Sequence, residues 1–308
     1  SSAALLLTGS SSNTVTRSHM QGASYYGAYL HTDASYNSIT LSTMISSSNS
    51  GLYITGNDSN TVTGSYMQGT GGLYLDTDAR NSTISLSTMI ATSLNGLYAF
   101  GAASNTVTRS YMAASTGRSA YLEGSSYNTI SYSTLTSGTR QMQIEGSSWN
   151  TVTQSYMQGN SGVLIIAASI NNTIEDSLMY GSTNYGFWLQ SSSSNTVRRS
   201  TMWGQSRGAI LNYAVSDYNT IELSTMIGAV NYGIQFSTAL SNTVTRSYMQ
   251  GGTRGVLLDD NSFFNSIDLS TMISAGNYGL QIDNASSNTV TRSHMEGNTY
   301  GAYLSLLG

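Results

Sequence analysis

The sequence predicts an all-β fold in which the chain winds into a parallel β-helix, a solenoid of about 13 coils of about 23 residues with three short strands per coil. One phrase recurs thirteen times at spacings of 22 to 24 residues: an Asn, then Thr or Ser, then Val or Ile. A Ser always stands five places after the start of the phrase, and a Met stands seven places after it except at Leu135. Apolar residues follow period-2 stretches broken by Gly, Ser and Asn, which is typical of short strands and not of helices.

The first strand of each coil is centred on the Val or Ile, and these two residue types alternate strictly from one phrase to the next. The second strand is centred on the Met. The third is centred on a phrase such as Gly51-Leu52-Tyr53-Ile54 or Gly186-Phe187-Trp188-Leu189. The recurring phrases begin at Asn13, Asn37, Asn60, Ser82, Asn105, Asn128, Asn150, Asn172, Asn195, Asn219, Asn242, Asn265 and Asn288.

Side chains alternate along a strand, so the Val/Ile column, the Met column and the apolar residues of the third strand are expected to point inward. Each would stack on its equivalent in the next coil and bury aliphatic surface worth about 25 cal/mol per Å². The Asn and Ser columns fall at turns between strands. There we expect each polar side chain to hydrogen-bond its counterpart one coil along.

A repeat this even offers no internal boundary, so residues 1–308 are predicted to form a single β-helix domain. Leu5-Leu6-Leu7 and Gly301-Ala302-Tyr303-Leu304 both read as third strands without a cap. Open strand edges of this kind favour stacking of another coil. We therefore expect the sequence to be a segment of a longer repeat array, or copies of it to associate end to end.

The composition excludes several kinds of partner. Only 8% of the residues are charged, and the net charge of −4 is spread along the chain, so no basic surface for nucleic acid is expected. No run of about 18 apolar residues occurs, which argues against membrane insertion. The chain has no Cys, and hence no disulfide framework.

The pattern resembles the right-handed parallel β-helix repeat proteins of the pectate-lyase-like and NosD-type superfamily. The matching phrases are N-T-V-T-R-S-Y-M at 105–112, N-S-I-T-L-S-T-M at 37–44 and third strands of the G-L-Y-I type. They extend over essentially the whole chain. The resemblance implies the architecture strongly and the function weakly, because the superfamily includes lyases, hydrolases, phage spikes, adhesins and surface proteins.

The enzymes of that superfamily imply a polysaccharide groove with a strong base or clustered carboxylates. The closest candidates here are the pair Asp259 and Asp260 and the pair Asp76 and Asp78, and we expect neither pair to have matching acids on adjacent coils. We interpret both pairs as solvated turns. No catalytic residue is therefore predicted, and the protein is expected not to be an enzyme.

No metal site and no cofactor are predicted. His19, His31 and His294 are too dispersed to bind a metal together. A column of Met residues is typical of copper ligands, but alternation points this column into the packed core, where Met is an ordinary filler.

Two outward apolar columns predict an interface. Leu and Ile of the second strand recur about 10 Å apart in alternate coils, and aromatic residues recur on the third strand. The predicted interface residues are Leu41, Ile45, Leu86, Ile90, Leu223, Ile227, Leu269, Ile273, Tyr29, Tyr53, Tyr74, Tyr98, Tyr121 and Trp188. With so few charges, they favour a non-enzymatic structural protein that self-assembles, laterally or also end to end, into a filament, sheath or surface layer, at an extracellular or cell-surface location.

Three other functions stay open. A carbohydrate-binding or adhesive module would use the Tyr column to hold glycans. An ice-binding protein would use paired hydroxyls such as Thr61 and Thr63, although Glu175 and Arg198 interrupt one file. A polysaccharide-cleaving enzyme is the third alternative.

Overall fold

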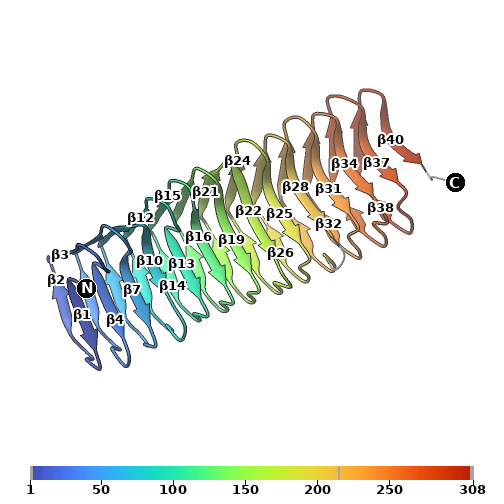
Figure 1. Ribbon diagram of the computed structural model, residues 1–308. Coiled ribbons are helices and arrows are strands. Elements are labelled where there is room, and N and C mark those ends of the chain that lie inside the picture. Colours follow the sequence, from blue (N-terminus) through green and yellow to red (C-terminus); the bar gives the residue numbers. More distant parts are fainter. Residues whose placement is uncertain (1–2, 214–215, 306–308) are drawn as a thin grey trace. The chain divides into compact units, whose positions relative to one another are not determined.

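A computed structural model describes residues 3–213 and 216–305. It confirms the predicted architecture, an all-β parallel solenoid of about 13 coils with three strands per coil (Figure 1). None of the described residues lies in a helix, so none belongs to a helix long and apolar enough to cross a membrane. The contacts divide the chain into two compact units, Ser1–Tyr156 and Met157–Gly308, which are described in turn.

Three parallel sheets form the first unit. Sheet A contains β1 (Leu5–Thr8), β4 (Ala28–His31), β7 (Ser50–Thr55), β10 (Gly71–Leu75), β13 (Leu97–Phe100), β16 (Arg118–Glu123) and β19 (Arg140–Glu145). Sheet B contains β2 (Thr14–Thr16), β5 (Ser38–Thr40), β8 (Thr61–Thr63), β11 (Thr83–Ser85), β14 (Thr106–Thr108), β17 (Thr129–Ser131) and β20 (Thr151–Thr153). Sheet C contains β3 (His19–Gly22), β6 (Thr43–Ser46), β9 (Tyr66–Gly69), β12 (Thr88–Ala91), β15 (Tyr111–Ala114) and β18 (Thr134–Ser137).

The second unit repeats this arrangement, and β21 (Tyr156–Gly159) contains the boundary between the units. Sheet A here contains β22 (Ser161–Ile166), β25 (Tyr185–Gln190), β28 (Arg207–Asn212), β31 (Tyr232–Ser237), β34 (Arg254–Asp259), β37 (Tyr278–Asp283) and β40 (Tyr300–Ser305). Sheet B contains β23 (Thr173–Glu175), β26 (Thr196–Arg198), β29 (Thr220–Glu222), β32 (Thr243–Thr245), β35 (Ser266–Asp268) and β38 (Thr289–Thr291). Sheet C contains β24 (Leu178–Gly181), β27 (Thr201–Gly204), β30 (Thr225–Gly228), β33 (Tyr248–Gly251), β36 (Thr271–Ser274) and β39 (His294–Gly297).

Equivalent residues of successive coils pair in register, as the repeat predicts. Met44 pairs with Met67 in sheet C, and Ile39 pairs with Val62 in sheet B. All four side chains are at most 1% exposed. The predicted inward columns are therefore the core.

The Asn column forms the predicted hydrogen-bonded ladder, which we call the Asn ladder. The backbone N–H of Asn37 donates to Oδ1 of Asn60 at 2.9 Å, and that of Asn105 donates to Oδ1 of Asn128 at the same distance. The amide of Asn128 then donates to the carbonyl oxygen of Ala102 at 3.0 Å. These bonds satisfy backbone groups that the turns leave unpaired.

The Ser column forms a second ladder at the corner between sheets B and C. The N–H of Ser42 donates to Oγ of Ser65 at 3.1 Å, while the Ser42 hydroxyl donates to the carbonyl oxygen of Thr40 at 2.8 Å. The residue that this second bond spans, Leu41, has a φ of 49°. A left-handed conformation costs about 1–2 kcal/mol in a non-Gly residue, and the paired Ser residues offset that cost.

This corner corrects the predicted position of four leucines. Alternation alone would place them on the outer face of the second strand. Instead they occupy the left-handed corner just before the Ser ladder, where they are 47–60% exposed: Leu41, Leu86, Leu223 and Leu269. The same corner position is taken by Arg17, Arg109 and Tyr132 in other coils, so these leucines do not form an apolar column with the isoleucines.

Candidate functional site

The outer face of sheet A in the first unit carries the predicted column of tyrosines. Their rings pack against one another along the sheet: Tyr74 lies 4.7 Å from Tyr98, and Tyr98 lies 5.1 Å from Tyr121, both with stacked rings. Tyr53 and Tyr74 are 4.9 Å apart and meet edge to face. Because the stacked ring faces cover each other, the column presents ring edges and hydroxyl groups.

The hydroxyl groups of these tyrosines donate to carboxylates at the ends of neighbouring strands. Tyr98 donates to Glu123 and Tyr121 donates to Glu145, both at 2.5 Å, and Tyr53 donates to Asp76. Burial, followed by the nearby carboxylates, raises the pKa values of Tyr53, Tyr98 and Tyr121 above the ordinary phenol range. The phenols therefore stay neutral near pH 7 and donate hydrogen bonds to these carboxylates.

Two arginines from adjacent strands converge beside these tyrosines. Arg118 and Arg140 pair in register at the starts of β16 and β19. Nε of Arg118 donates to Oε1 of Gln143 at 2.8 Å, and Nη1 of Arg140 donates to the same oxygen at 2.7 Å. The Gln143 amide donates to Glu145 at 2.6 Å. One hydrogen-bonded network thus joins the arginine pair to a tyrosine and a carboxylate.

Neither arginine of this pair has an ion-pair partner among the residues that the structure describes. Burial, and then the charge of Arg118, lowers the pKa of Arg140. A hollow of about 270 Å³ lies beside the two side chains and is lined by Thr116, Gly117 and Thr139 as well. Two neighbouring cations that face an open hollow are suited to bind an anion.

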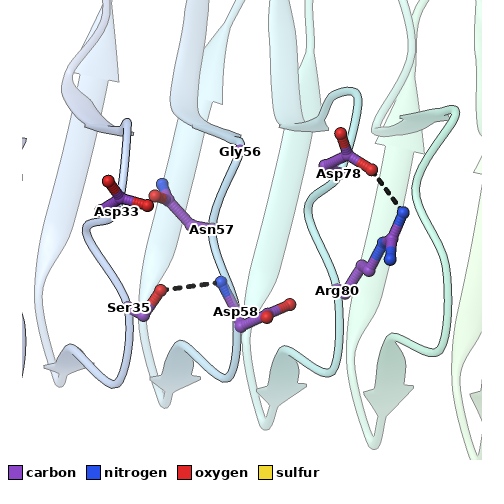
Figure 2. Close-up of a pocket in the computed structure, with 7 residues that line it drawn as sticks. All are labelled: Asp33, Ser35, Gly56, Asn57, Asp58, Asp78 and Arg80. Atoms are coloured by element: carbon purple, nitrogen blue, oxygen red, sulfur yellow. Dashed lines mark hydrogen bonds and ion pairs between the residues drawn. The ribbon is translucent and has the colours of Figure 1, made fainter.

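A second hollow, of about 350 Å³, lies at the turns that follow β4, β7 and β10. Figure 2 shows that Asp33, Asp58 and Asp78 reach it from three successive turns, with Arg80 bonded to Asp78 at 2.5 Å. The sequence predicted Asp78 as a solvated turn residue, and it is exposed. Within residues 3–213 and 216–305, no three His, Cys, Asp or Glu side chains are placed together to hold a metal ion.

The structure separates the other residues of the predicted interface. The isoleucines lie half-buried on the outer face of sheet C: Ile45, Ile90, Ile227 and Ile273. Trp188 lies on β25 in the second unit, where its indole N–H donates to Asn212 at 2.7 Å. The residues of the predicted interface therefore lie on three different surfaces: the leucines at the corners, the isoleucines on sheet C and the aromatic residues on sheet A. Contact with a partner at any of these surfaces stays a prediction.

The predicted carboxylate pairs also need correction. Asp76 is not a solvated turn residue, because it accepts the Tyr53 hydroxyl. Asp259 ends β34, and burial, with the adjacent charge of Asp260, raises its pKa. The neighbouring strand ends at Asp283, whose charge acts on Asp259, so a matching acid does occur one coil along.

Sequence reasoning missed the arginines of sheet A altogether. A signal was present, since third strands of six residues that begin with Arg and end with an acid occur at R-S-A-Y-L-E 118–123, R-Q-M-Q-I-E 140–145 and R-G-V-L-L-D 254–259.

The chain belongs to the NosD family, described as periplasmic copper-binding protein, which matches residues 101–269 and 140–306. Residues 3–137 match the right handed beta helix region family. These matches confirm the resemblance and indicate an extracytoplasmic location. No curated protein matches the sequence.

Two solved structures share the fold. The A-module of the mannuronan C-5 epimerase AlgE4 of Azotobacter vinelandii aligns over 94% of this chain and 90% of that one, with 12% identity and a TM-score of 0.56. A double mutant of the periplasmic alginate epimerase AlgG aligns over 89% of this chain and 76% of that one, with 12% identity and a TM-score of 0.58.

These findings contradict the prediction of a non-enzymatic protein that self-assembles into a filament. Both solved structures described above are carbohydrate-modifying enzymes, and neither the family matches nor these structures indicate a filament. The structure also gives a physical reason for the error. The leucines counted as a stripe lie at corners, and the stacked tyrosines are bonded to carboxylates of the same chain.

The copper in the family description does not fit the residues of this chain. Copper prefers Cys, Met and His ligands. Met44, Met67 and Met89 of the Met column are fully buried in the core, and the sequence has no Cys. His19 and His294 are exposed and lie within 3.5 Å of Gln21 and Glu296, respectively.

Proposed function

We propose that the protein is a carbohydrate-active enzyme that acts on an acidic polysaccharide along the outer face of sheet A in residues 1–156. The reaction would begin with removal of a proton from the sugar carbon that bears the carboxylate. The observation that carries the proposal is the arginine pair, Arg118 and Arg140, joined through Gln143 to the hydrogen-bonded Tyr121 and Glu145.

The arginine pair supplies the electrostatic part of this chemistry. A proton next to a carboxylate is hard to remove because negative charge accumulates on the carboxylate as the C–H bond breaks. Two guanidinium groups bound to that carboxylate stabilise the added charge, and such preorganised donors contribute most where water is displaced. Their lack of ion-pair partners leaves them available for this role.

The tyrosines and carboxylates supply the proton transfers. Glu123 and Glu145 are candidate bases that would accept the proton. Tyr98 and Tyr121 carry the hydroxyl protons nearest these carboxylates and would donate one. Return of a proton to the same carbon from the opposite side of the sugar inverts that carbon. Donation instead to the oxygen that leaves the next carbon breaks the chain and forms a carbon–carbon double bond.

The comparisons support this proposal through the fold alone. Both similar structures bear the names of enzymes that epimerise mannuronan or alginate, which are acidic polysaccharides. We therefore take mannuronan as the first substrate to test. An extracellular or cell-surface location, where such polymers occur, is part of the proposal.

The test is incubation of the full chain with mannuronan in D₂O, followed by NMR measurement of deuterium at the carbon that bears the carboxylate. Absorbance of unsaturated ends measures chain cleavage in the same samples. We expect exchange in the unaltered protein and a loss of about 10²-fold or more in Arg140→Gln. The matched control is Arg109→Gln, which removes the same charge from an exposed corner where Gln154 occupies the equivalent position.

Two results would contradict the proposal. One is the absence of exchange and cleavage with mannuronan and with a panel of other polyuronates. The other is an Arg140→Gln variant that is folded by circular dichroism and as active as the unaltered protein.

A further inference from the structure

The outer face of sheet A in the second unit carries a different arrangement of arginines. Arg207, Tyr232 and Arg254 pair in register at the starts of β28, β31 and β34. The guanidinium carbons of Arg207 and Arg254 each lie 5.2 Å from the centre of the Tyr232 ring. Each guanidinium is thus stacked on tyrosine. Nε of Arg254 also donates to Oε1 of Gln281, so the terminal nitrogens of Arg254 are the donors left for another partner.

These arginines are also without carboxylate partners. Neither Arg207 nor Arg254 belongs to an ion pair within the described ranges of the chain. Nε of Arg207 is buried and has no hydrogen-bond acceptor. A buried donor without a partner costs about 1–3 kcal/mol, so an acceptor supplied by a ligand would be favourable there.

Two acceptors on the next strands lack donors. Oε1 of Gln235 and Oδ1 of Asp259 are both buried without a hydrogen-bond partner. The Gln235 amide donates to the other carboxylate oxygen of Asp259 at 2.9 Å, so the two orphaned oxygens belong to one bonded pair. The register places Gln235 between Ile210 and Leu257 on the outer face of the sheet.

The ligand must therefore offer an anionic acceptor to the arginines and donors to Gln235 and Asp259. Phosphate or sulfate satisfies only the arginines, and a neutral sugar leaves their charge without a counterion. A sugar acid has both groups, since hydroxyls are adjacent to its carboxylate. Successive strands of a sheet are about 4.8 Å apart, so Arg207 and Arg254, two strands apart, lie about 10 Å apart. An extended polyuronate with two-fold symmetry also turns every second carboxylate to the same side.

We propose that the outer face of β28, β31 and β34 is a binding site for an acidic oligosaccharide, with Arg207 and Arg254 on carboxylates and Gln235 and Asp259 on hydroxyls. This site lies wholly in the second unit. It includes none of the residues assigned to proton transfer, and it would bind sugar acids whether or not the protein is an enzyme.

The test uses oligomannuronate as the probe and the full chain carrying Arg140→Gln, so that the arginine pair of the first unit does not dominate binding. Calorimetry measures affinity. The indole N–H signal of Trp188 reports locally, because Trp188 pairs with Ile210 on β28. Two further variants use residues that the same columns already contain: Arg207→Tyr, as at Tyr185 and Tyr232, and Gln235→Leu, as at Leu164 and Leu257.

We expect saturable binding that shifts the Trp188 signal, and a loss of affinity of roughly tenfold or more in each variant. The matched control is Arg246→Tyr, which removes one charge from an exposed corner of the same unit. Tyr132 occupies the equivalent corner position in a coil of the first unit, so tyrosine is tolerated there. Its affinity should be unchanged. The exchange assay depends on Arg140 and this binding assay on Arg207, so either proposal can fail alone.

Three results would overturn the site. The first is that the Arg207→Tyr variant binds the probe with the same affinity as the protein that keeps Arg207. The second is equal binding of a neutral oligomannose. The third combines two observations: the probe does not bind, and near pH 7 the protein has an infrared band of a neutral carboxylic acid that disappears in Asp259→Asn. Asp259 would then be protonated, and a proton between Asp259 and Gln235 would satisfy both oxygens without a ligand.

Discussion

The Asn ladder has one irregular position, Ser82, and replacing it with Asn is expected to stabilise the first unit. Ser82 is 1% exposed. Its shorter side chain accepts the N–H of Asn60 at 3.2 Å, whereas regular positions of the ladder have 2.9 Å. The side-chain amide nitrogen of Asn60 is buried without an acceptor, while Asn105 and Asn128 each donate to the Asn of the next coil.

The magnitude follows from the bonds that Ser82→Asn restores. An intramolecular hydrogen bond contributes about 0.5–1.5 kcal/mol net, and an unsatisfied buried donor costs about 1–3 kcal/mol. Ordering a longer side chain removes part of that gain. We expect the free energy of unfolding to rise by about 1–2 kcal/mol.

Urea unfolding followed by circular dichroism measures this change, and hydrogen exchange measures it locally. Exchange of the Asn60 backbone amide should slow by about tenfold, since local opening sets that rate. The matched control is Ser87→Asn. Ser87 Oγ already donates to Ser85 and accepts from Ser65, so a larger residue there only overpacks a buried corner and should destabilise by about 1–3 kcal/mol. An unchanged or faster exchange at Asn60 in Ser82→Asn would refute the reasoning.

Three further predictions follow from the same contacts. Met112→Ala, at a fully buried position of the Met column, should lower the free energy of unfolding by about 2–5 kcal/mol in urea titrations, whereas Leu135→Met should change it by less than about 1.5 kcal/mol. Asp259 has a raised pKa in the folded chain, so the folded state holds its proton more tightly; stability should fall as pH rises from 3.8 through that raised pKa, and Asp259→Asn should remove this slope. Arg292 lowers the pKa of Asp268, so its contribution has the opposite sign and should disappear as pH falls below 3.8, which Asp268→Asn tests in the same titration.

The fold could be predicted from the sequence because the inward columns obey one rule in every coil. Met44 and Met67 stack because each coil returns the chain to the same register, and no other information is needed. Leu41 could not be placed by that rule, because a left-handed residue at the corner interrupts the alternation. The arginines escaped notice for a related reason. The position of the Arg118 guanidinium depends on its hydrogen bond to Gln143 in the next coil. A repeat pattern does not show which side chains of neighbouring coils bond to each other.

The in-register stacking that builds the core also places the like charges of Arg118 and Arg140 side by side. Their repulsion is a cost to stability that a bound anion would offset. Arg118 and Arg140 donate to one oxygen, so their charges lie about 5 Å apart, and at an effective dielectric constant of about 20 they repel by about 3 kcal/mol before solvent screening. In the second unit Tyr232 separates Arg207 from Arg254 and avoids this repulsion.

A purely structural solenoid would gain from the same alternation in the first unit, so the retained pair points to a bound anion. We therefore expect Arg140→Tyr to raise the urea midpoint of unfolding while it lowers the rate of deuterium exchange in mannuronan. Stability gained with activity lost is the pattern of a residue kept for function. A variant that is both less stable and fully active would mean that the pair serves the fold instead.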